Sequence, residues 1–522
     1  MPIRPNYWDF QYKISHQINN KTTLTLLGVG AIDKFYYVAP QNSTPEKRYA
    51  LNISPTINQW SYTVGASLKK LINKGYWNVS ISRSHLNNIS EKYEDNLNPI
   101  KGEKTFDYTS NDISNTIRFD ITKSFLGLKW TTGANLQSIE YDNSTFQILP
   151  RPYVDSAILP TYLPAPNYFK YATNLNYRKY GAFFQIGKRA FNNRLGISAG
   201  IRTDGNGFNT AGREFYNRLS PRIGFSYVLT DKINLNASVG RYFKVAPNTS
   251  LGFKDLNGNY VNKEADYIGA NHYVAGIEYL PSESTRFTAE VFYKKYFNVP
   301  ISIQKGLSLS NLGADFNILG NEPIISNGKG RSYGYELFAQ QKLTDRFFGV
   351  ASYSFFRSAY TDINGTYIKS SWENIHVLSL TGGYKFNKNW EFGIKYRFQG
   401  GTPYTPYNMD ASRINFLTQG LGVLDYNKIN TLRLPNYHSS DIRIDKKYNY
   451  KKTTFDFFID ITNWYGSNSV SPNVYTFEAN TDGSFKTTDG KPIQKNGANG
   501  IPNLTNSNRV FVTPTFGFIW EF

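Results

Sequence analysis

TFGFIWEF, residues 515–522, closes the chain and decides its fold. Aromatic side chains stand at every second position of this stretch, from Phe516 to Phe522. A repeat of two is the period of a β-strand, because successive side chains point to opposite faces of a sheet. The stretch therefore predicts a β-strand with one strongly aromatic face.

The same alternation recurs along the whole chain. In residues 390–399, Trp, Phe, Ile, Tyr and Phe alternate with Glu, Gly, Lys, Arg and Gln. Charges at every second position would be buried in the dry core of a β-sandwich, which is costly, but they face water inside a barrel. The pattern predicts an all-β protein, a transmembrane antiparallel β-barrel. Similar ladders stand at residues 117–122, 222–229, 287–293, 333–337 and 455–461.

Composition agrees with a barrel that has one lipid-facing and one polar face. Aromatic residues make up 16% of the chain and include 40 Tyr, yet the mean hydropathy is −0.48. The sequence contains no apolar run of about 18 residues, which excludes a helical membrane protein. Residues 1–5, MPIRP, lack the apolar segment of a signal peptide. The absence of Cys excludes disulfides and thiolate metal sites.

The chain is strongly basic, with 58 Lys and Arg against 39 Asp and Glu, a net charge of +19. These residues are spread over the whole length and form no basic helix or nucleic-acid module, so we expect no nucleic acid as a partner. An anionic cell surface, and lipopolysaccharide in particular, is the partner that this charge favours.

Short and long connections alternate between the predicted strands. Outer-membrane barrels show the same alternation, with short periplasmic turns and long extracellular loops. We count about 19 strands. Because the last strand must end in the periplasm, an odd number places the first strand's start outside the cell, so we expect the C-terminal part of a larger barrel. Nine predicted turns have Asn-, Asp- or Gly-containing tips or similar short loops, such as residues 19–21, 73–75, 125–127, 230–232 and 387–389. Long loops are predicted at 93–112, 149–171, 246–271, 304–330, 403–437 and 466–508.

Several stretches resemble the TonB-dependent outer-membrane receptors, and the Asn-, Tyr- and Lys-rich style resembles receptors of the Bacteroidota. The resemblance covers nearly the whole chain, and its motifs are specific as an ordered set rather than singly. They are RLSPRIGFSY (218–227), LTDK (229–232), SVGRYF (238–243), RSYGYEL (331–337), GTPYTP (401–406), DIRIDKKY (441–448), FIDITN (458–463) and FGFIWEF (516–522).

The resemblance implies a 22-stranded barrel, plugged by an N-terminal domain and coupled to the inner-membrane TonB complex through a short N-terminal box. Residues 1–522 would then hold the barrel's C-terminal part, without three strands, the plug or the box. The implied function is active uptake of a scarce solute, such as an iron chelate, oligosaccharide or peptide, across the outer membrane of a Gram-negative bacterium. The implied partners also include the barrel assembly machinery and a surface lipoprotein.

Three groups of residues are candidates for function. The aromatic end of the chain is the expected assembly signal, at Phe518, Trp520 and Phe522. Aromatic side chains in the long loops are candidates for ligand contact, although packing within the loops or at the membrane interface is favoured for most of them: Trp372, Tyr404, Tyr407 and Tyr437. Charged side chains on the polar faces of the ladders are expected to line the lumen, where pairing with one another or holding the plug is favoured over direct contact with substrate. They are Arg118, Asp120, Glu290, Glu336, Arg397, Arg443, Asp445, Asp456 and Asp460.

Other functions fit the sequence less well. The five His residues are scattered singly, so no catalytic triad or metal site is predicted and no cofactor is expected. Residues 255–259, with Asp266, space oxygen atoms somewhat like a calcium loop, but a tight Asn-Gly turn is favoured because Gly258 is misplaced for an EF-hand. A passive porin-like channel and a surface adhesin remain as alternatives to a gated transporter.

Overall fold

One large antiparallel β-sheet forms the molecule. The computed structural model describes residues 3–38, 51, 54–93, 96–97, 102–148, 168–255, 257–312, 322–419, 422–505 and 508–522. Among these residues the sheet contains 20 strands, of which one is the three-residue β15 (Tyr367–Lys369) and nineteen are long. The predicted all-β barrel fold and the predicted number of strands are confirmed. The long strands are β1 (Ile3–Asn19), β2 (Thr22–Tyr37), β3 (Thr56–Ile72), β4 (Gly75–Tyr93), β5 (Lys104–Phe125), β6 (Leu128–Ile148), β7 (Tyr168–Ala190), β8 (Leu195–Asn206), β9 (Ser220–Thr230), β10 (Ile233–Lys244), β11 (Ile268–Ser282), β12 (Thr285–Ser302), β13 (Ile324–Gln341), β14 (Phe347–Thr361), β16 (His376–Lys385), β17 (Trp390–Gln399), β20 (Tyr437–Asn449), β21 (Thr454–Thr462) and β26 (Thr513–Glu521).

The short connections lie where the sequence predicts them. Residues 19–21, 73–75 and 125–127 join β1–β2, β3–β4 and β5–β6. Lys74, Leu126 and Gly127 have φ values of 57°, 49° and 72°, the left-handed conformation that tight hairpins need. The predicted loop at 93–112 is wrong over its second half, because β5 begins at Lys104 and pairs with β4 up to Tyr93. Residues 149–167 of another predicted loop lie outside the described residues.

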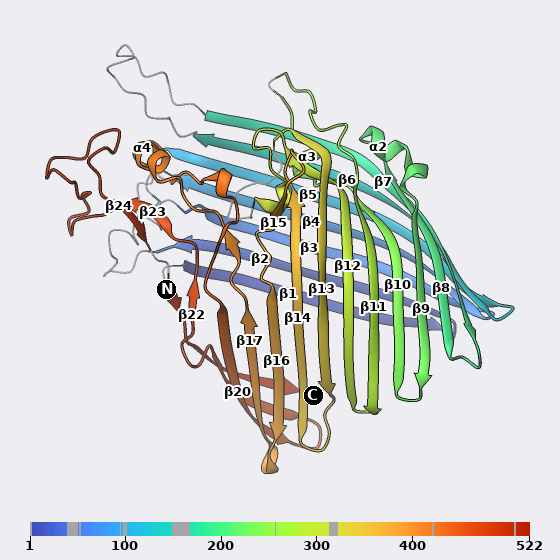
Figure 1. Ribbon diagram of the computed structural model, residues 1–522. Coiled ribbons are helices and arrows are strands. Elements are labelled where there is room, and N and C mark those ends of the chain that lie inside the picture. Colours follow the sequence, from blue (N-terminus) through green and yellow to red (C-terminus); the bar gives the residue numbers. More distant parts are fainter. Residues whose placement is uncertain are drawn as a thin grey trace.

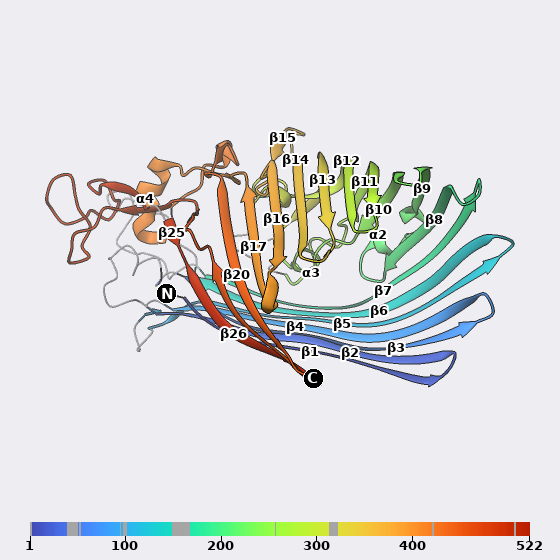
Figure 2. The same ribbon diagram turned by 90° about the horizontal axis from the view of Figure 1, so that it is seen from below.

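The sheet curves so that its first and later strands face each other. In Figure 1 the strands follow the sequence colours around the sheet, and in Figure 2 β1–β7 form one wall and β9–β17 the other, joined through β8. Among the described strands, β1 pairs only with β2, and β26 pairs only with β21. Among the described residues, no helix has the length and apolar composition needed to cross a bilayer.

The register of the strands assigns every side chain to one of two faces. Asp112 on β5 identifies the inner face. The loop between β10 and β11, which lies inside the curve of the sheet, contacts its side chain. Asp120 lies on the same face, and it is followed around the sheet by its register partners Gly133, Phe183 and Arg202. The outer face carries the apolar rungs of the predicted ladders, which are exposed as lipid-facing residues must be.

Two loop regions at one end of the sheet have small cores of their own. One core packs Leu251 and Ala246 of the β10–β11 loop against Leu175 and Tyr177 of β7. The other packs Phe416 against Tyr475 and Phe477. The loop elements are α2 (Thr210–Arg213), η1 (Phe215–Arg218), α3 (Asn248–Leu251), η2 (Leu309–Asn311), β18 (Pro403–Tyr404), α4 (Met409–Gln419), η4 (Tyr426–Lys428), β19 (Leu432–Arg433), β22 (Asn468–Val470), β23 (Val474–Phe477), β24 (Pro502–Thr505) and β25 (Asn508–Val510), and η3 (Asn387–Asn389) forms a turn at the other end.

Candidate binding site on the inner wall

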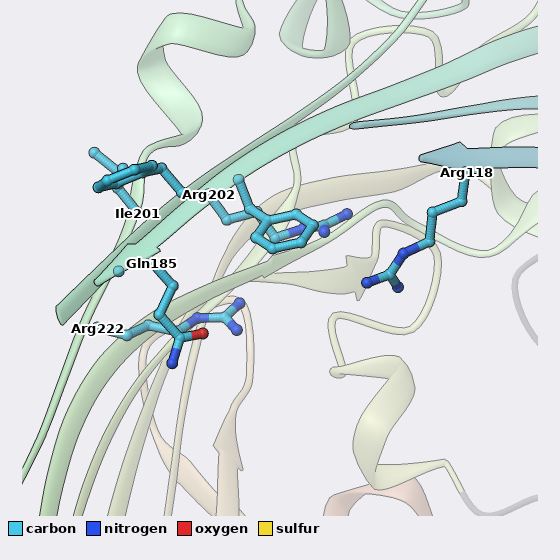
Figure 3. Close-up of a pocket in the computed structure, with 8 residues that line it drawn as sticks. Arg118, Gln185, Ile201, Arg202 and Arg222 are labelled. Carbon is cyan, nitrogen blue, oxygen red and sulfur yellow. The ribbon is translucent and has the colours of Figure 1, made fainter. Parts of the chain in front are cut away.

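A basic pocket lies on the inner face of β5, β7, β8 and β9. Its volume is about 220 Å³, and three arginines line it: Arg118, Arg202 and Arg222. In Figure 3 their side chains point into one common space, whereas Ile201 projects from the other side of β8. The alternation along β8 therefore places a cation inside and an aliphatic residue outside at consecutive positions.

Arg118 enters the pocket from β5 and is held by two neighbours. Its Nε lies 3.2 Å from Oδ1 of Asp120, two residues along the same strand. Its guanidinium centre lies 5.5 Å from the centre of the Phe183 ring, within the range of a cation–π contact. Half of the Arg118 side chain is still exposed, so the guanidinium can bind a further anion.

Arg202 is more firmly fixed than Arg118. Its Nε and Nη2 donate to the two oxygens of Asp204 at 2.7 and 2.5 Å, and Nη2 also approaches Oδ1 of Asn135 at 3.3 Å. Gly181, on the neighbouring strand, leaves room for this pair, because a Cβ atom there would lie 3.0 Å from Nη2. The bidentate pair neutralises most of the charge of Arg202.

Arg222 lacks such a carboxylate. Its guanidinium lies 4.3 Å from the centre of the Tyr242 ring, and that ring lies 4.5 Å from the ring of His272. Tyr242 lies over Gly240, where a Cβ atom would come within 3.0 Å of the ring. In the described part of the chain, Arg222 forms no ion pair. An aromatic support orients a guanidinium without removing its charge.

The pocket therefore combines three permanent positive charges with two carboxylates. Guanidinium groups bind carboxylates and phosphates with directed, charge-assisted hydrogen bonds. The Phe183 ring adds an apolar surface beside them. Among the described residues, no three His, Asp or Glu side chains gather into a group that could hold a metal ion. The chemistry of the pocket is that of an anion site.

The loop between β10 and β11 covers the inner wall above this pocket. Asn248 in α3 donates through Nδ2 to Oδ2 of Asp112 at 3.1 Å, and its Oδ1 accepts from the Tyr177 hydroxyl at 2.8 Å. Ser250 and Leu251 are fully buried. Asp112 precedes Arg118 by six residues on β5, so the loop lies nearer the long-loop end than the pocket. It lies between that end and the arginines.

The tip of this loop is a turn, as the sequence favours. Oδ1 of Asp255 accepts from the backbone N–H groups of Asn257 and Asn259 at 2.9 and 2.8 Å. These bonds, with that from Asn259 first, lower the pKa of the Asp255 carboxyl. Asp266 instead pairs with Arg218 at 2.5 Å, so it does not join Asp255 as a calcium loop would require.

The other predicted inner-face charges fall into separate groups. Arg443 donates to both oxygens of Asp445 at 2.9 and 3.0 Å through Nε, and its guanidinium lies 3.8 Å from the Phe458 ring centre. Lys447 lies 3.3 Å from Glu391 and 3.7 Å from Asp456. The Arg443–Asp445 pair lies within β20, whereas Lys447 joins β20 to β17 and β21. Cross-strand pairs such as those of Lys447 stabilise a sheet, which is the role that the sequence favours over contact with substrate.

The remaining charges of that set are placed differently. Arg397 pairs with Asp441 at 2.9 Å. Asp460 lies opposite Arg443 in register. Glu290 and Glu336 lie directly opposite each other on β12 and β13. Their contacts with a plug or a solute stay a prediction.

A second pocket, of about 760 Å³, opens lower on the inner wall. Glu290 lines it together with small residues of β7–β11 such as Gly187, Ser198, Gly224 and Ser238. The long side chains of Lys129, Lys188 and Arg189 also line it. The pocket lies between the arginine pocket and the short-turn end.

The loop aromatics do not form one surface. Tyr407 packs against Tyr475 at 5.9 Å, beside the Phe416 core, so it stabilises the loops. Trp372 is 47% exposed, with its ring 6.0 Å from that of Tyr360. Tyr404 lies in β18, and Tyr437 begins β20. Their contact with a ligand stays a prediction.

The aromatic end of the chain is exposed on the outer face. Phe518, Trp520 and Phe522 are 66%, 55% and 94% exposed. The Trp520 ring stacks on Phe455 of the neighbouring strand at 5.9 Å. Their role as an assembly signal stays a prediction.

Sequence reasoning found Arg118 and Asp120 but did not select Arg202, Arg222 or Phe183. The signal was present for Arg222, which stands on the polar side of the ladder at 222–229. Alternation within single strands does not show how the sheet curves, and it is this curvature that brings β5, β7, β8 and β9 around one pocket.

Comparison with known families settles what kind of sheet this is. Residues 6–463 match the family model described as TonB dependent receptor-like, beta-barrel. The chain belongs to this family. The resemblance stated from the motifs is thus confirmed, and the family is one of receptors rather than enzymes. No curated protein matches the chain by sequence.

Solved structures show the same fold. The ferripyoverdine receptor of the outer membrane of Pseudomonas aeruginosa is 16% identical, with a TM-score of 0.61 over 99% of this chain and 65% of that one. The ferric citrate transporter FecA is 12% identical, with a TM-score of 0.62 over 100% and 71%. The siderophore receptor PiuA from Acinetobacter baumannii is 12% identical, with a TM-score of 0.62 over 100% of this chain and 75% of that one.

The chain spans 65–66% of the length of the first three matching chains, which include the ferripyoverdine receptor. As a member of this barrel family it is a protein of the Gram-negative outer membrane. The long loops therefore face the outside of the cell, and the short turns face the periplasm.

Proposed function

We propose that this TonB-dependent receptor barrel takes up an anionic solute, with a ferric chelate as the first candidate. The arginine pocket carries this proposal, because Arg222 and half-exposed Arg118 present positive charge on the inner wall. Several structural neighbours are named for ferripyoverdine or ferric citrate. An oligosaccharide or a peptide remains within the family's range, but neither explains three arginines in one pocket.

The route follows from the order of the features along the inner wall. A solute enters past the extracellular loops and the β10–β11 loop, binds at the arginines, and passes the wide pocket beside Glu290. Lys129 and Arg189 also line this second pocket, so an anion that leaves the arginines meets positive charge again before the short-turn end.

Energy coupling belongs to the whole receptor. We expect three further strands, a plug domain and a TonB-binding box to complete it. The backbone edges of β1 and β26 support this expectation, because an unpaired strand edge is not tolerated in the hydrocarbon of a bilayer. The shorter length relative to the matching receptors agrees with it. In this arrangement TonB moves the plug, and the barrel supplies selectivity.

Binding to the full-length protein, purified from outer membranes, tests the solute class. Titration with ferric citrate should show affinity that falls about 10- to 100-fold in Arg222→Gln, the cost of one hydrogen-bonded charge. Arg194→Gln, at an exposed periplasmic turn, is the matched control. Equal affinity of the wild type and Arg222→Gln for every anionic chelate would reject the pocket as the site.

Conductance and uptake test the mechanism separately. A gated receptor should show no steady large conductance in planar bilayers, and its uptake of the bound chelate should stop when the proton-motive force is removed. A steady large conductance of the full-length protein would instead establish the passive channel.

A further inference from the structure

A row of basic side chains crosses the outer face of β10–β13. Arg241 on β10 is the register partner of Asn271 on β11, Asn271 is the partner of Lys295 on β12, and Lys295 is the partner of Arg331 on β13. Arg241, Lys295 and Arg331 are all exposed. These three cations, here named the basic row, lie on the face that is opposite to the arginine pocket.

Aromatic belts fix the level of the membrane on these strands. The upper belt is formed by Tyr273, Tyr293 and Tyr333, whose ring centres are 6.3 and 6.5 Å apart in succession. Tyr279 and Phe287 stack at 6.2 Å in the lower belt. Six residues separate the belts along a strand, roughly 20 Å. That spacing approaches the apolar band of about 25 Å between the two girdles of an outer-membrane barrel.

The basic row lies just beyond the upper belt. Lys295 follows Tyr293 by two residues and Arg331 precedes Tyr333 by two, which is roughly 7 Å along the strands. The β10–β11 loop leaves the sheet at this end, so this is the outer leaflet. The basic row is therefore at the level of the lipid headgroups.

Nothing described in the chain neutralises these cations. Among the described residues, no carboxylate forms an ion pair with Arg241, Lys295 or Arg331. Lys295 and Arg331 lie directly opposite each other, an arrangement of like charges that destabilises a sheet. Nε of Arg241 donates to Asn271 at 2.9 Å, and Arg331 lies 4.4 Å from the Tyr367 ring centre. These contacts orient the guanidinium groups but leave their charge.

We propose that the basic row binds the phosphate groups of lipopolysaccharide in the outer leaflet. An anion placed over Lys295 and Arg331 removes their repulsion, and the fixed guanidinium of Arg241 adds a directed donor. The apolar outer face below the upper belt receives the acyl chains of the same lipid. This site is independent of solute transport, because its residues are on the outer face.

Lipid binding by the full-length protein in detergent tests the proposal. The probe is lipid A with its phosphates, counted on the protein by native mass spectrometry. Replacing Arg241, Lys295 and Arg331 together by Gln should weaken binding on the order of 100-fold, from about fivefold for each charge lost at a membrane surface. Lys294→Gln is the matched control, one residue from Lys295 on the inner face, and should bind lipid A as the wild type does.

Further measurements distinguish phosphorylated lipid A from free phosphate as the ligand. A variant with Arg241→Lys and Arg331→Lys keeps the charge and should retain most of the affinity, which shows that loss in the Gln variant is not a folding defect. Dephosphorylated lipid A should bind the wild type no better than the Gln variant. Unchanged lipid A binding in the triple Gln variant, or equal binding of the dephosphorylated lipid to the wild type, would overturn the proposal. So would displacement of lipid A by an equimolar amount of inorganic phosphate, which would mark a free-phosphate site.

Discussion

Replacing Asn248 by Ala should release the β10–β11 loop from the inner wall. The Asn248 side chain joins α3 to two strands, through its bonds to Asp112 at 3.1 Å and from Tyr177 at 2.8 Å. A bond to a charged group contributes about 1.5–3 kcal/mol and a neutral one about 0.5–1.5 kcal/mol. The free energy of local opening should therefore fall by about 2–4 kcal/mol.

Hydrogen exchange measures this opening directly. The amides of Leu251 and Gly252 donate within the loop at 3.0 and 2.8 Å, and Leu251 is fully buried. Their exchange should accelerate about 30- to 700-fold in Asn248→Ala. Asn259→Ala is the control, because the side chain of Asn259 bonds only within its own turn. Unchanged exchange at Leu251 and Gly252 would refute the reasoning that Asn248 holds the loop on the wall.

Three further predictions follow from contacts elsewhere in the chain. Arg433→Met should destabilise the loops around β19 by about 1.5–3 kcal/mol, seen as faster proteolysis there, because it removes the bond at 2.5 Å to the Glu373 carboxylate, which has 4% of its side chain exposed and keeps only the longer ion pair with Arg357 at 3.5 Å; proteolysis at the wild-type rate would contradict this. Gly181→Val should displace the Arg202–Asp204 pair and weaken chelate binding without preventing assembly, whereas Gly187→Val, with more room around its Cβ, should bind normally. Burial raises the pKa of Tyr267 from 10.0 to about 12, so the folded state holds the phenol proton more tightly than the unfolded state does. The stability that this difference contributes is present below pH 10 and is lost as the pH rises through 12. Hydrogen exchange in the β10–β11 loop should therefore rise over that interval more in the wild type than in Tyr267→Phe, and equal pH profiles would count against it.

Strand identity was readable from the sequence, and loop structure was not. The ladder at 390–399 became β17 with the same bounds to within one residue, because alternation is a local property that a sheet imposes on each strand separately. The loop expected at 93–112 is wrong over its second half because Asn111 and Asp112 make both faces of β5 polar above the membrane, where no lipid enforces alternation. Tyr407 is a candidate for ligand contact on its sequence, but the remote segment that contains Tyr475 packs against it.

The sequence by itself determined the barrel class, the membrane and the polar inner face, because a two-residue period in a lipid setting admits one architecture. Only the tertiary structure decided which polar residues act together. Arg118, Arg202 and Arg222 meet because β5, β8 and β9 curve around one pocket, and Arg241, Lys295 and Arg331 align because the four strands β10–β13 share a register. Both groupings depend on contacts between residues tens of positions apart, which no local pattern encodes.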